Sequence, residues 1–397
     1  MRIGVDATCW PSRRGYGRFV RALITATLSS DRENEYVLFV DSEPEEFPLP
    51  EHLAEVVRVS CRQPATKAAA ADGRRALRDV WALSRAISAK KLDLFFFPSV
   101  YSFVPIGSRV PIIVTVHDAI AELHPELIFP TLRSKLFWRA KVKLACAQAR
   151  LILTVSEYAK RCVTEQLGIA LSRLRVVNEA SDPVFRQFDL ETGGLPIGRL
   201  GQISPKARYL VYVGGFSPHK NLTMLVNVFQ QLQSQPQFAD LRLLLVGDYE
   251  KDVFYSCYTQ VLEQVKQAGL QERVLFPGYL ADQDLARILN GAQALVLPSF
   301  SEGFGLPAIE AAACGAPTVV TTKSPLPELL GEGTIGVDPK DRAALLNALQ
   351  TILSDPPRRE AMRRAALAAA ARLSWENSAR QLLAIFHEVL ETCGAPA

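Results

Sequence analysis

The stretch ALVLPSFSEGFGLPAIE (residues 294–310) joins a short apolar run to a segment that carries two glutamates, and it decides how the rest of the chain is interpreted. The run 294–297 predicts a buried strand, and Pro307 suits the first turn of a helix. Between them, Gly303 and Gly305 let the backbone of a loop approach a ligand closely. Because the first N–H groups of a helix lack partners and carry partial positive charge, this unit favours a diphosphate or an array of sugar hydroxyls.

Apolar runs of strand length alternate with helix-length segments along the chain. The runs lie at residues 3–6, 36–40, 56–60, 94–97, 112–116, 151–155, 175–177, 209–213, 241–246, 274–276, 294–297 and 318–321. Their nearly continuous hydrophobicity suits parallel strands that are buried on both faces. The alternation predicts an α/β protein with doubly wound sheets, and 397 residues exceed the usual size of one core.

Two Rossmann-like domains with parallel sheets facing across a cleft are therefore expected. We place the N-terminal domain at residues 1–187, a linker at 188–208 and the C-terminal domain at 209–374. The apolar spacing in residues 375–397 predicts a final helix that crosses back to the N-terminal domain. In folds of this kind the ligand lies at the carboxyl ends of the strands.

Composition narrows the class of protein further. The seven cysteines are scattered and form no C-x-x-C pair, which indicates reduced thiols and no structural zinc. Met1 runs straight into the first strand, and no apolar run approaches the length that crosses a bilayer. We therefore expect a cytoplasmic protein. A net charge of +4 is too small to indicate nucleic acid as a partner.

The positive charge is unevenly distributed. Residues 58–91 hold nine Lys/Arg against two Asp, and residues 131–150 hold six Lys/Arg and no acid. Within the second segment Leu132, Leu136, Phe137, Ala140 and Leu144 share one helical face. Most such helices pack on their own domain. The alternative is peripheral contact with anionic lipid at the inner face of a membrane, beside a lipid-linked acceptor.

Three further motifs follow predicted strands. YVGGFSPHKNL (212–222) places Lys220 before a helix that begins near Asn221, and VTVHDA (114–119) places His117 and Asp118 at a strand end. RGYGR (14–18) is a short glycine loop between the first strand and the first helix. By itself each has an ordinary structural interpretation: a surface lysine, a core histidine and a tight turn.

Glu302 and Glu310, eight positions apart around Gly-Phe-Gly-Leu-Pro, resemble the E-x7-E motif of glycosyltransferase family 4, the retaining GT-B enzymes. The Leu-Pro-Ser before the motif and the Ala-x-x-Cys-Gly-x-Pro-Thr-Val-Val after it are also similar to that family. The resemblance extends over nearly the whole chain.

The resemblance implies that the domain at 1–187 binds the acceptor and that the domain at 209–374 binds the nucleotide sugar. It also implies roles for the C-terminal motifs. Glu310 would bind the ribose of the donor nucleotide, Glu302 would hold the 3- and 4-hydroxyls of the transferred sugar, and Lys220 would contact the donor diphosphate. Many family members also have an arginine near this lysine, at a position held here by Gly215, Phe216 or His219. Further donor contacts are implied for Gly303, Phe304, Gly305, Leu306, Gly215, Tyr279 and Leu280.

It also implies roles for the N-terminal motifs. Gly15 and Gly17 would lie beside the donor phosphates, and His117 would lie near the 6-hydroxyl of the donor sugar. Asp118 and Tyr16 are expected on the acceptor side. The Val-His-Asp element and the Glu-Gly-Phe-Gly-Leu-Pro run resemble mannosyl- or rhamnosyl-type polysaccharide enzymes, so GDP-mannose is the leading donor and a glycan or lipid-linked molecule is the expected acceptor.

No metal or resident cofactor is expected. Asp282 and Asp284 spell the D-x-D of metal-dependent transferases, but they open a predicted helix, where Asp282 reads as an N-cap. Two alternatives to a transferase stay open. One is a nucleotide-sugar epimerase of the same fold, and the other is a donor-binding regulator without catalysis.

Overall fold

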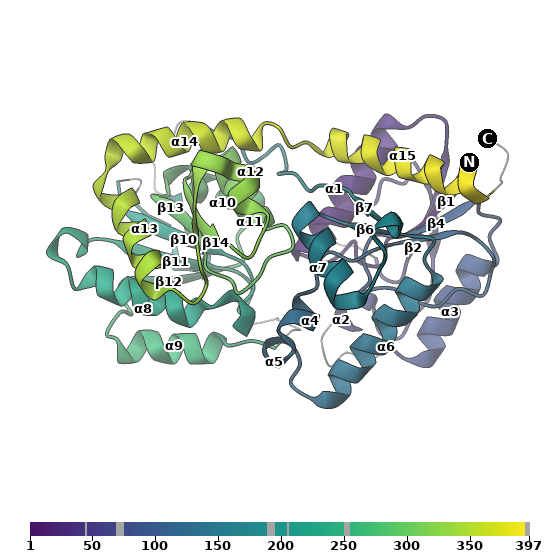
Figure 1. The fold of residues 1–397 in the computed structure, drawn as a ribbon, viewed down its shortest axis with the longest axis horizontal. Helices are drawn as coiled ribbons and strands as arrows, with labels where there is room; N and C mark the ends of the chain where they lie inside the picture. Colours follow the sequence, from purple (N-terminus) through teal and green to yellow (C-terminus); the bar gives the residue numbers. More distant parts are fainter. Residues whose placement is uncertain (44–45, 69–74, 189–194, 205, 250–254, 394–397) are drawn as a thin grey trace. The chain divides into compact units, whose positions relative to one another are not determined.

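The computed structural model describes residues 1–43, 46–68, 75–188, 195–204, 206–249 and 255–393 (Figure 1). It divides into two compact units. Unit 1 contains Met1–Glu179 together with Ser374–Ala397, and unit 2 contains Ala180–Leu373. The chain therefore leaves unit 1 after residue 179 and returns to it at residue 374. Among the described residues, no helix is long and apolar enough to cross a membrane.

Unit 1 is built on a seven-stranded parallel sheet in the order β3-β2-β1-β4-β5-β6-β7. Its strands are β1 (Arg2–Asp6), β2 (Glu35–Val40), β3 (Glu55–Arg58), β4 (Leu94–Phe97), β5 (Ile112–Thr115), β6 (Leu151–Thr154) and β7 (Leu174–Val176). Its helices are α1 (Gly15–Ser30), α2 (Ala65–Ala68), α3 (Leu77–Ser88), α4 (Ile120–Leu123), α5 (Pro125–Ile128), α6 (Leu132–Gln148), α7 (Glu157–Leu167) and α15 (Trp375–Cys393). A 3-10 turn, η1, spans Leu171–Arg173. The central strands are fully buried, as their apolar sequences require.

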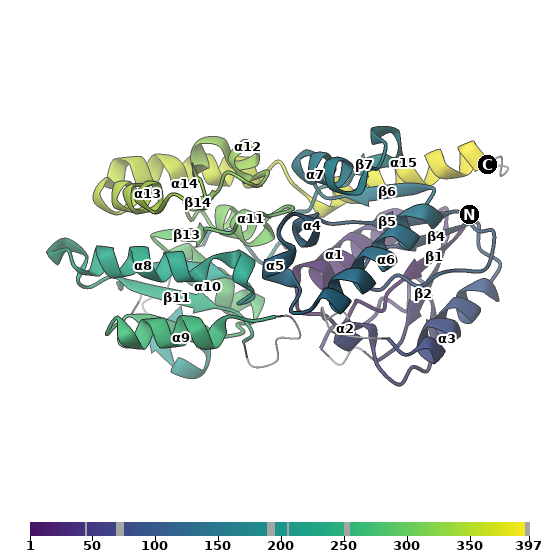
Figure 2. The ribbon, with the colours of Figure 1, turned by 60° about the horizontal axis from the view of Figure 1, so that its bottom comes forward.

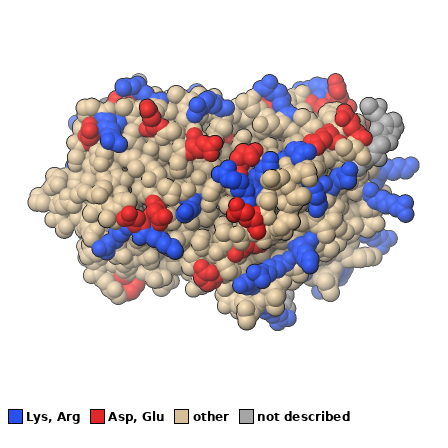
Figure 3. All heavy atoms as spheres, viewed as in Figure 1, with Lys and Arg blue, Asp and Glu red and all other residues tan. Residues whose placement is uncertain are grey.

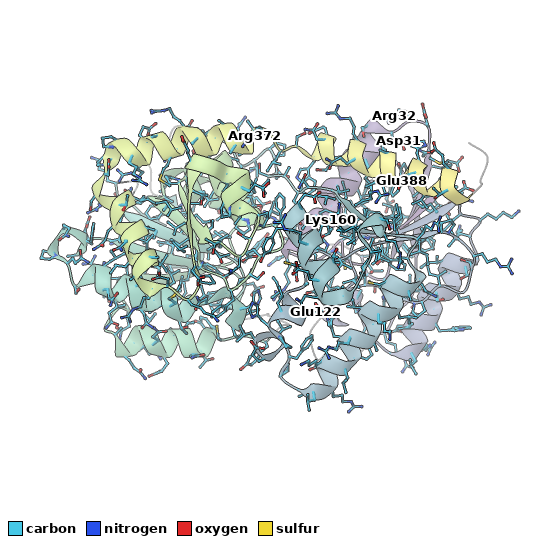
Figure 4. All side chains as sticks on the ribbon, in the orientation of Figure 1. Asp31, Arg32, Glu122, Lys160, Arg372 and Glu388 are labelled. Atoms are coloured by element: carbon cyan, nitrogen blue, oxygen red, sulfur yellow. The ribbon has the colours of Figure 1, made fainter. Side chains whose placement is uncertain are left out.

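The final helix α15 completes unit 1. It packs along α1 (Figures 1 and 2), and the ring of Phe386 lies 5.7 Å from that of Phe96 on β4, centroid to centroid. Glu388, labelled in Figure 4, accepts hydrogen bonds from the guanidinium of Arg175 on β7, with 2.9 Å between Nε and Oε2. The hydroxyl of Ser378 donates to the carbonyl of Asn178 at 2.6 Å. These contacts fix the C-terminal segment to unit 1.

Unit 2 repeats the plan with a six-stranded parallel sheet in the order β12-β11-β10-β13-β14-β15. Its strands are β10 (Tyr209–Val213), β11 (Arg242–Val246), β12 (Val274–Gly278), β13 (Ala294–Leu297), β14 (Thr318–Thr321) and β15 (Thr334–Val337). Its helices are α8 (Leu222–Gln233), α9 (Tyr258–Gln267), α10 (Asp282–Gly291), α11 (Leu306–Ala313), α12 (Leu326–Leu330), α13 (Arg342–Ser354) and α14 (Pro356–Ala370). The 3-10 turns η3 (Pro218–Lys220), η4 (Pro236–Phe238) and η5 (Gly331–Gly333) connect them.

The segment expected as a linker is partly folded. Strands β8 (Leu195–Pro196) and β9 (Gln202–Ile203) form an antiparallel hairpin around η2 (Gly198–Leu200). Side chains such as Leu195 and Ile203 are buried against unit 2, because β8 packs on α10 and η2 packs on β12. The Thr-Gly-Gly run at 192–194, on which the linker expectation also rested, lies outside the described residues.

Candidate functional site

The order of the strands in unit 2 marks one position as suited to ligands. From β10 the chain proceeds to β11 and β12 on one side, and then to β13, β14 and β15 on the other. Because the crossovers lie on opposite faces of the sheet, the loops after β10 and β13 separate at this point. Lys220 follows β10 and Glu302 follows β13. Two predicted site residues therefore flank the switch point of the sheet.

These two side chains form an ion pair. The ammonium of Lys220 donates to Oε1 of Glu302 at 2.8 Å and to Oε2 at 3.1 Å. The side chains are 20% and 9% exposed. Ser299, which is fully buried, donates its hydroxyl to the same Oε1 at 2.6 Å. Both carboxylate oxygens of Glu302 are thus oriented, while the ammonium, with three donors, retains capacity for a further acceptor.

Asn221 fixes the turn that carries Lys220. It is the one described non-glycine residue with a positive φ, at 58°, and it is the N-cap of α8. Its side-chain amide donates to the carbonyl of Pro298, at 3.1 Å, and to that of Pro339, at 2.8 Å. Because Pro298 opens the loop that leads to Glu302, one buried amide couples the two loops of the switch point.

Helix α11 begins at the glutamate loop. Gly305 is its N-cap, with φ at +91°, and a Cβ there would lie 2.6 Å from the side chain of Leu326. No described side chain caps this helix, and its first turn contains no acid. Phe304 and Leu306 direct their side chains into the core, at 3% and 6% exposure. The side chains of these two residues are therefore used in packing, and the helix start retains its partial positive charge. A donor contact of their backbone groups stays a prediction.

Glu310 lies one turn further along α11 and is 2% exposed. Burial, and to a smaller extent the nearby carboxylate of Glu310, raise the pKa of the Cys314 thiol to about 12. Glu310 and Glu302 therefore belong to the same strand–loop–helix unit, as their spacing predicts. The assignment of Glu310 to a ribose stays a prediction.

Unit 1 has its own switch point, between β1 and β4. His117, which follows β5, lies close to it, since its Nε2 is 3.0 Å from the carbonyl oxygen of Pro98, directly after β4. A carbonyl can only accept, so Nε2 carries the proton and has no lone pair to act as a general base in this geometry. Nδ1 lies 3.6 Å from the carboxylate of Glu179, and the ring meets that of Phe19 edge-on.

Gly15 and Gly17 follow β1 and form the first turn of α1. A Cβ on Gly15 would meet nothing within 4 Å, whereas a Cβ on Gly17 would lie 2.2 Å from the carbonyl oxygen of Ser12. Gly17 therefore has a structural reason to be glycine, and Gly15 faces open space. Tyr16 between them contacts the ring of Tyr101, at 5.2 Å between centroids.

Asp118 has a local function as well. Its Oδ1 accepts from the backbone N–H of Ile120 at 2.9 Å, at the start of α4. This bond orients the loop that follows β5 and holds the carboxylate beside it. An acceptor contact for Asp118 or Tyr16 remains a prediction.

The remaining predicted donor contacts lie at the ends of β10 and β12. The carbonyl of Gly215 accepts from the hydroxyl of Tyr212 at 2.5 Å. Tyr279 is half-buried, while Leu280 is 4% exposed, and its Cδ2 would lie 3.1 Å from a Cβ on Gly198. The side chain of Leu280 is therefore used in packing. A contact of its backbone with the nucleotide base stays a prediction.

The expectation that Asp282 is an N-cap is wrong. Helix α10 starts at Asp282 itself, and its N-cap is Ala281. Asp282 and Asp284 both lie in the first turn, where two negative charges complement the helix dipole. The interaction with the helix dipole thus accounts for the two acidic residues at this position.

Sequence reasoning did not find Ser299, Asn221 and Glu179 as members of these sites. Ser299 lies within the motif at residues 298–310 and bonds Glu302 three residues further on. Asn221 bonds the carbonyls of Pro298 and Pro339, which are distant in sequence. Glu179, 5% exposed, lies beyond the last predicted strand of unit 1. A buried acidic residue after an apolar run was the available signal.

Comparison with known proteins places this fold in a class. The chain aligns over 99% of its length with sucrose-phosphate synthase from Thermosynechococcus elongatus (all of that chain, TM-score 0.77, 19% identity). It aligns over 98% with Anabaena HepE in complex with UDP-glucose (all of that chain, TM-score 0.71, 19% identity). The lipopolysaccharide glycosyltransferase WaaG gives a TM-score of 0.72 over 97% of the chain and 99% of its own length, at 14% identity. The fold is the GT-B fold of glycosyltransferases, as predicted.

Sequence relatives agree with that class. The O-antigen chain mannosyltransferase B of Escherichia coli is 31% identical over 59% of the chain and 60% of its own length. The serotype-specific mannosyltransferase WbdA of E. coli is 26% identical over 70% of the chain. The matched stretch spans only 33% of WbdA, so the chain corresponds to part of these relatives.

Two family models cover most of the chain. Residues 14–183 match Glycosyltransferase Family 4, and residues 201–368 match Glycosyl transferases group 1. The chain belongs to the family 4 type of glycosyltransferases, which confirms the resemblance drawn from the E-x7-E motif.

Proposed function

We propose that the protein is a retaining glycosyltransferase that moves a hexose from a nucleotide diphosphate sugar to a glycan or lipid-linked acceptor in polysaccharide biosynthesis. One observation carries the proposal: Lys220 and Glu302 form a hydrogen-bonded pair at the switch point of unit 2, beside the uncapped start of α11. A cation, a carboxylate and a helix N-terminus are the groups that a sugar diphosphate needs.

In the proposed complex the diphosphate accepts hydrogen bonds from Lys220 and from the first N–H groups of α11. Glu302 accepts from sugar hydroxyls, and Glu310 accepts from the ribose. The positive charge offsets the negative charge that develops on the diphosphate as the glycosidic bond breaks. Lys220 and the helix supply this charge, so we propose that no divalent metal is required. Turnover should be unchanged by a chelator such as EDTA.

Retention of the anomeric configuration fits a same-face substitution. In this mechanism a departing phosphate oxygen takes the proton of the acceptor hydroxyl, which then attacks the anomeric carbon from the face that the diphosphate leaves. No protein nucleophile is needed. His117, whose Nε2 donates to Pro98, would orient the sugar rather than remove a proton. The anomeric configuration of the product, determined by NMR, tests retention directly.

GDP-mannose is the leading donor. Two of the relatives are named mannosyltransferases, whereas the HepE structure contains UDP-glucose. A thermal-shift screen of the protein with GDP-, UDP-, ADP- and dTDP-sugars separates these donors. The largest increase in Tm is expected with GDP-mannose, and a larger one with UDP-glucose would reject that assignment. Because the chemistry needs soluble sugar nucleotides, we place the enzyme in the cytoplasm, on the side of the membrane where such donors are made available.

Product analysis tests the reaction class. A glycosylated acceptor supports the transferase, and a new free sugar nucleotide would indicate an epimerase. Donor binding without either product would indicate a regulator. Glu310→Gln should lower turnover strongly and leave the Tm nearly unchanged. The matched control is Glu328→Gln, an exposed glutamate on α12, which should have wild-type activity.

A further inference from the structure

Exposed apolar side chains gather on two helices of unit 1. In the described part of the chain, nine large hydrophobic residues are strongly exposed, and six of them lie on α3 or α6. They are Leu77 (87%), Trp81 (61%), Leu132 (78%), Leu136 (65%), Phe137 (52%) and Leu144 (43%). Scattered exposed apolar residues are normal, but a concentration of this kind marks an interaction surface.

On α6 the apolar face is the outer face of the helix. The residues that contact the core are Ser134, Val142, Ala145 and Cys146. Leu132, Leu136 and Phe137 lie on the other side, exposed to solvent. The sequence had left open whether this face packs on its own domain, and in the structure it does not. These side chains therefore have no intramolecular reason to be leucine and phenylalanine.

The charges between them are all positive. Arg133, Arg139 and Lys143 on α6 and Arg78 and Arg85 on α3 are exposed. Asp79 is the sole acid of the two helices, and it is 2% exposed, with its carboxylate bound to backbone N–H groups of residues 62 and 63. Figure 3 shows a run of Lys and Arg over α6.

The two helices cover the same face of the sheet. Leu83 and Ile87 of α3 and Val142 and Ala145 of α6 belong to one core cluster, on top of β4 and β5. The outer surfaces of both helices therefore point away from the sheet on one side (Figure 2). We name this outer surface, formed by the six exposed hydrophobic and five exposed cationic residues above, the α3–α6 face.

We propose that the α3–α6 face docks on an anionic lipid bilayer. Leucine, phenylalanine and tryptophan side chains can enter the boundary between headgroups and acyl chains, and arginine and lysine beside them attract anionic headgroups. The guanidinium of Arg85 lies 5.1 Å from the ring centroid of Trp81, an amphipathic pair suited to that boundary. We choose a lipid rather than a protein partner, because cations and apolar side chains alternate over this face and the one acid of the two helices is buried.

Vesicle flotation tests the proposal without any donor sugar, so its outcome is independent of the proposed activity. The protein should float with vesicles that contain phosphatidylglycerol and not with pure phosphatidylcholine. The variant Arg133→Gln/Arg139→Gln/Lys143→Gln should bind about 100-fold more weakly, because each cation near an anionic surface adds several-fold to the affinity. The matched control, Arg342→Gln/Arg358→Gln/Arg364→Gln, removes three exposed charges from unit 2 and should bind like the wild type.

The apolar residues have their own test. Leu136→Ser/Phe137→Ser should weaken vesicle binding about 10-fold or more, since two apolar side chains lose their burial. Leu171→Ser/Leu200→Ser is the control at exposed leucines elsewhere. The fluorescence of Trp81 should shift to shorter wavelength on binding, and the shift should be absent from Trp81→Phe. The shift is measured in a Trp138→Phe background, because Trp138 on α6 is half-buried, whereas Trp10 and Trp375 are buried and would not contribute.

Three results would overturn the proposal. The first is the absence of salt-sensitive binding to anionic vesicles. The second is binding that both α6 variants retain in full. The third is self-association of the wild type that Leu136→Ser/Phe137→Ser abolishes, because the face would then join two copies of the chain. All variants are checked by circular dichroism and thermal unfolding, which should be unchanged because the altered side chains are exposed.

Discussion

The ammonium of Lys220 donates hydrogen bonds to both carboxylate oxygens of Glu302 across the switch point of unit 2. Its Nζ lies 2.8 Å from Oε1 and 3.1 Å from Oε2. The two residues are distant in sequence, and each follows a different strand. Their pairing places a cation and an oriented acceptor next to the start of α11.

A double-mutant cycle separates the structural from the catalytic role of this pair. Lys220→Met and Glu302→Gln should each lower the free energy of unfolding by about 1–3 kcal/mol, because each leaves a partly buried charge without its partner. The double variant should recover most of that loss. Turnover should fall about 100- to 1,000-fold in Lys220→Met and should not recover in the double variant. Lys266→Met, an exposed lysine on α9, is the control.

Recovery of turnover in the double variant would show that Lys220 serves only to neutralise Glu302. Urea unfolding gives the free energy of unfolding, and steady-state kinetics give the turnover, of the wild type, the two single variants and the double variant.

Asn221 should act as a positioning residue. Asn221→Gly keeps the left-handed backbone and removes the two hydrogen bonds of the side chain, so the stability should fall by about 1–2 kcal/mol. Asn221→Ala should lower the free energy of unfolding by about 1 kcal/mol more than Asn221→Gly does, because alanine is strained at this φ. In both variants kcat should fall with little change in the KM for the acceptor. Wild-type kcat in Asn221→Gly would show that the amide does not position Lys220.

Two glycines at the candidate sites should respond oppositely to alanine. Gly305→Ala places a Cβ on a residue with φ at +91° and against Leu326, and should destabilise the protein by about 1–3 kcal/mol. A Cβ on residue 15 has no other atom within 4 Å, so Gly15→Ala should be neutral or should stabilise the protein by up to about 1 kcal/mol. Loss of activity in a stable Gly15→Ala variant would support a ligand at this position, and full activity would argue against it.

Asp41 should give a pH-dependent contribution to stability. Its side chain is fully buried, and burial raises its pKa to about 6, although the adjacent Arg75 acts in the other direction. Between its unfolded pKa, near 3.8, and about 6 the folded protein binds a proton that the unfolded chain does not. The free energy of unfolding should therefore fall by about 3 kcal/mol as the pH rises through this window.

The matched variant Asp41→Asn has no carboxyl group to titrate at this position. The free energy of unfolding of both proteins is measured with urea from about pH 4 to 7. The difference between the two curves gives the pH-dependent contribution of the Asp41 carboxyl group. A difference that does not change with pH would contradict the prediction.

Buried parallel strands were predictable because their sequences are continuously apolar. Every predicted run corresponds to a strand within about two residues, the usual disagreement at element ends. β15 (Thr334–Val337) was missed, because it is an edge strand with half-exposed residues and its TIGV sequence carries a weak signal. The β8–β9 hairpin was missed because two-residue strands leave no periodicity.

The part of the candidate site whose functional residues are close together in sequence was predictable. The loop, the helix start and the two glutamates of residues 298–310 are local features, and a resemblance added their roles. The hydrogen bonds of Asn221 to Pro298 and of His117 to Pro98 were not predictable in this way, because bonds between loops on neighbouring strands depend on the order of the strands. Ser299 lies within the motif, but its bond to Glu302 depends on how the loop folds. The sequence also could not predict which way the apolar face of α6 points, because a helical pattern does not show which side of the helix packs on the sheet.

The return of α15 to unit 1 has a consequence for biosynthesis. Unit 2 is one continuous stretch of chain, whereas the layer formed by α1 needs Ala379, Leu382 and Phe386 to cover it, and these residues are synthesised after the whole of unit 2. On the ribosome, the second unit can thus complete its core before the first, whose apolar flank stays uncovered until α15 has been synthesised. Premature termination within the last helix would leave a protein whose later half is intact and whose earlier half is a target for chaperones and proteases.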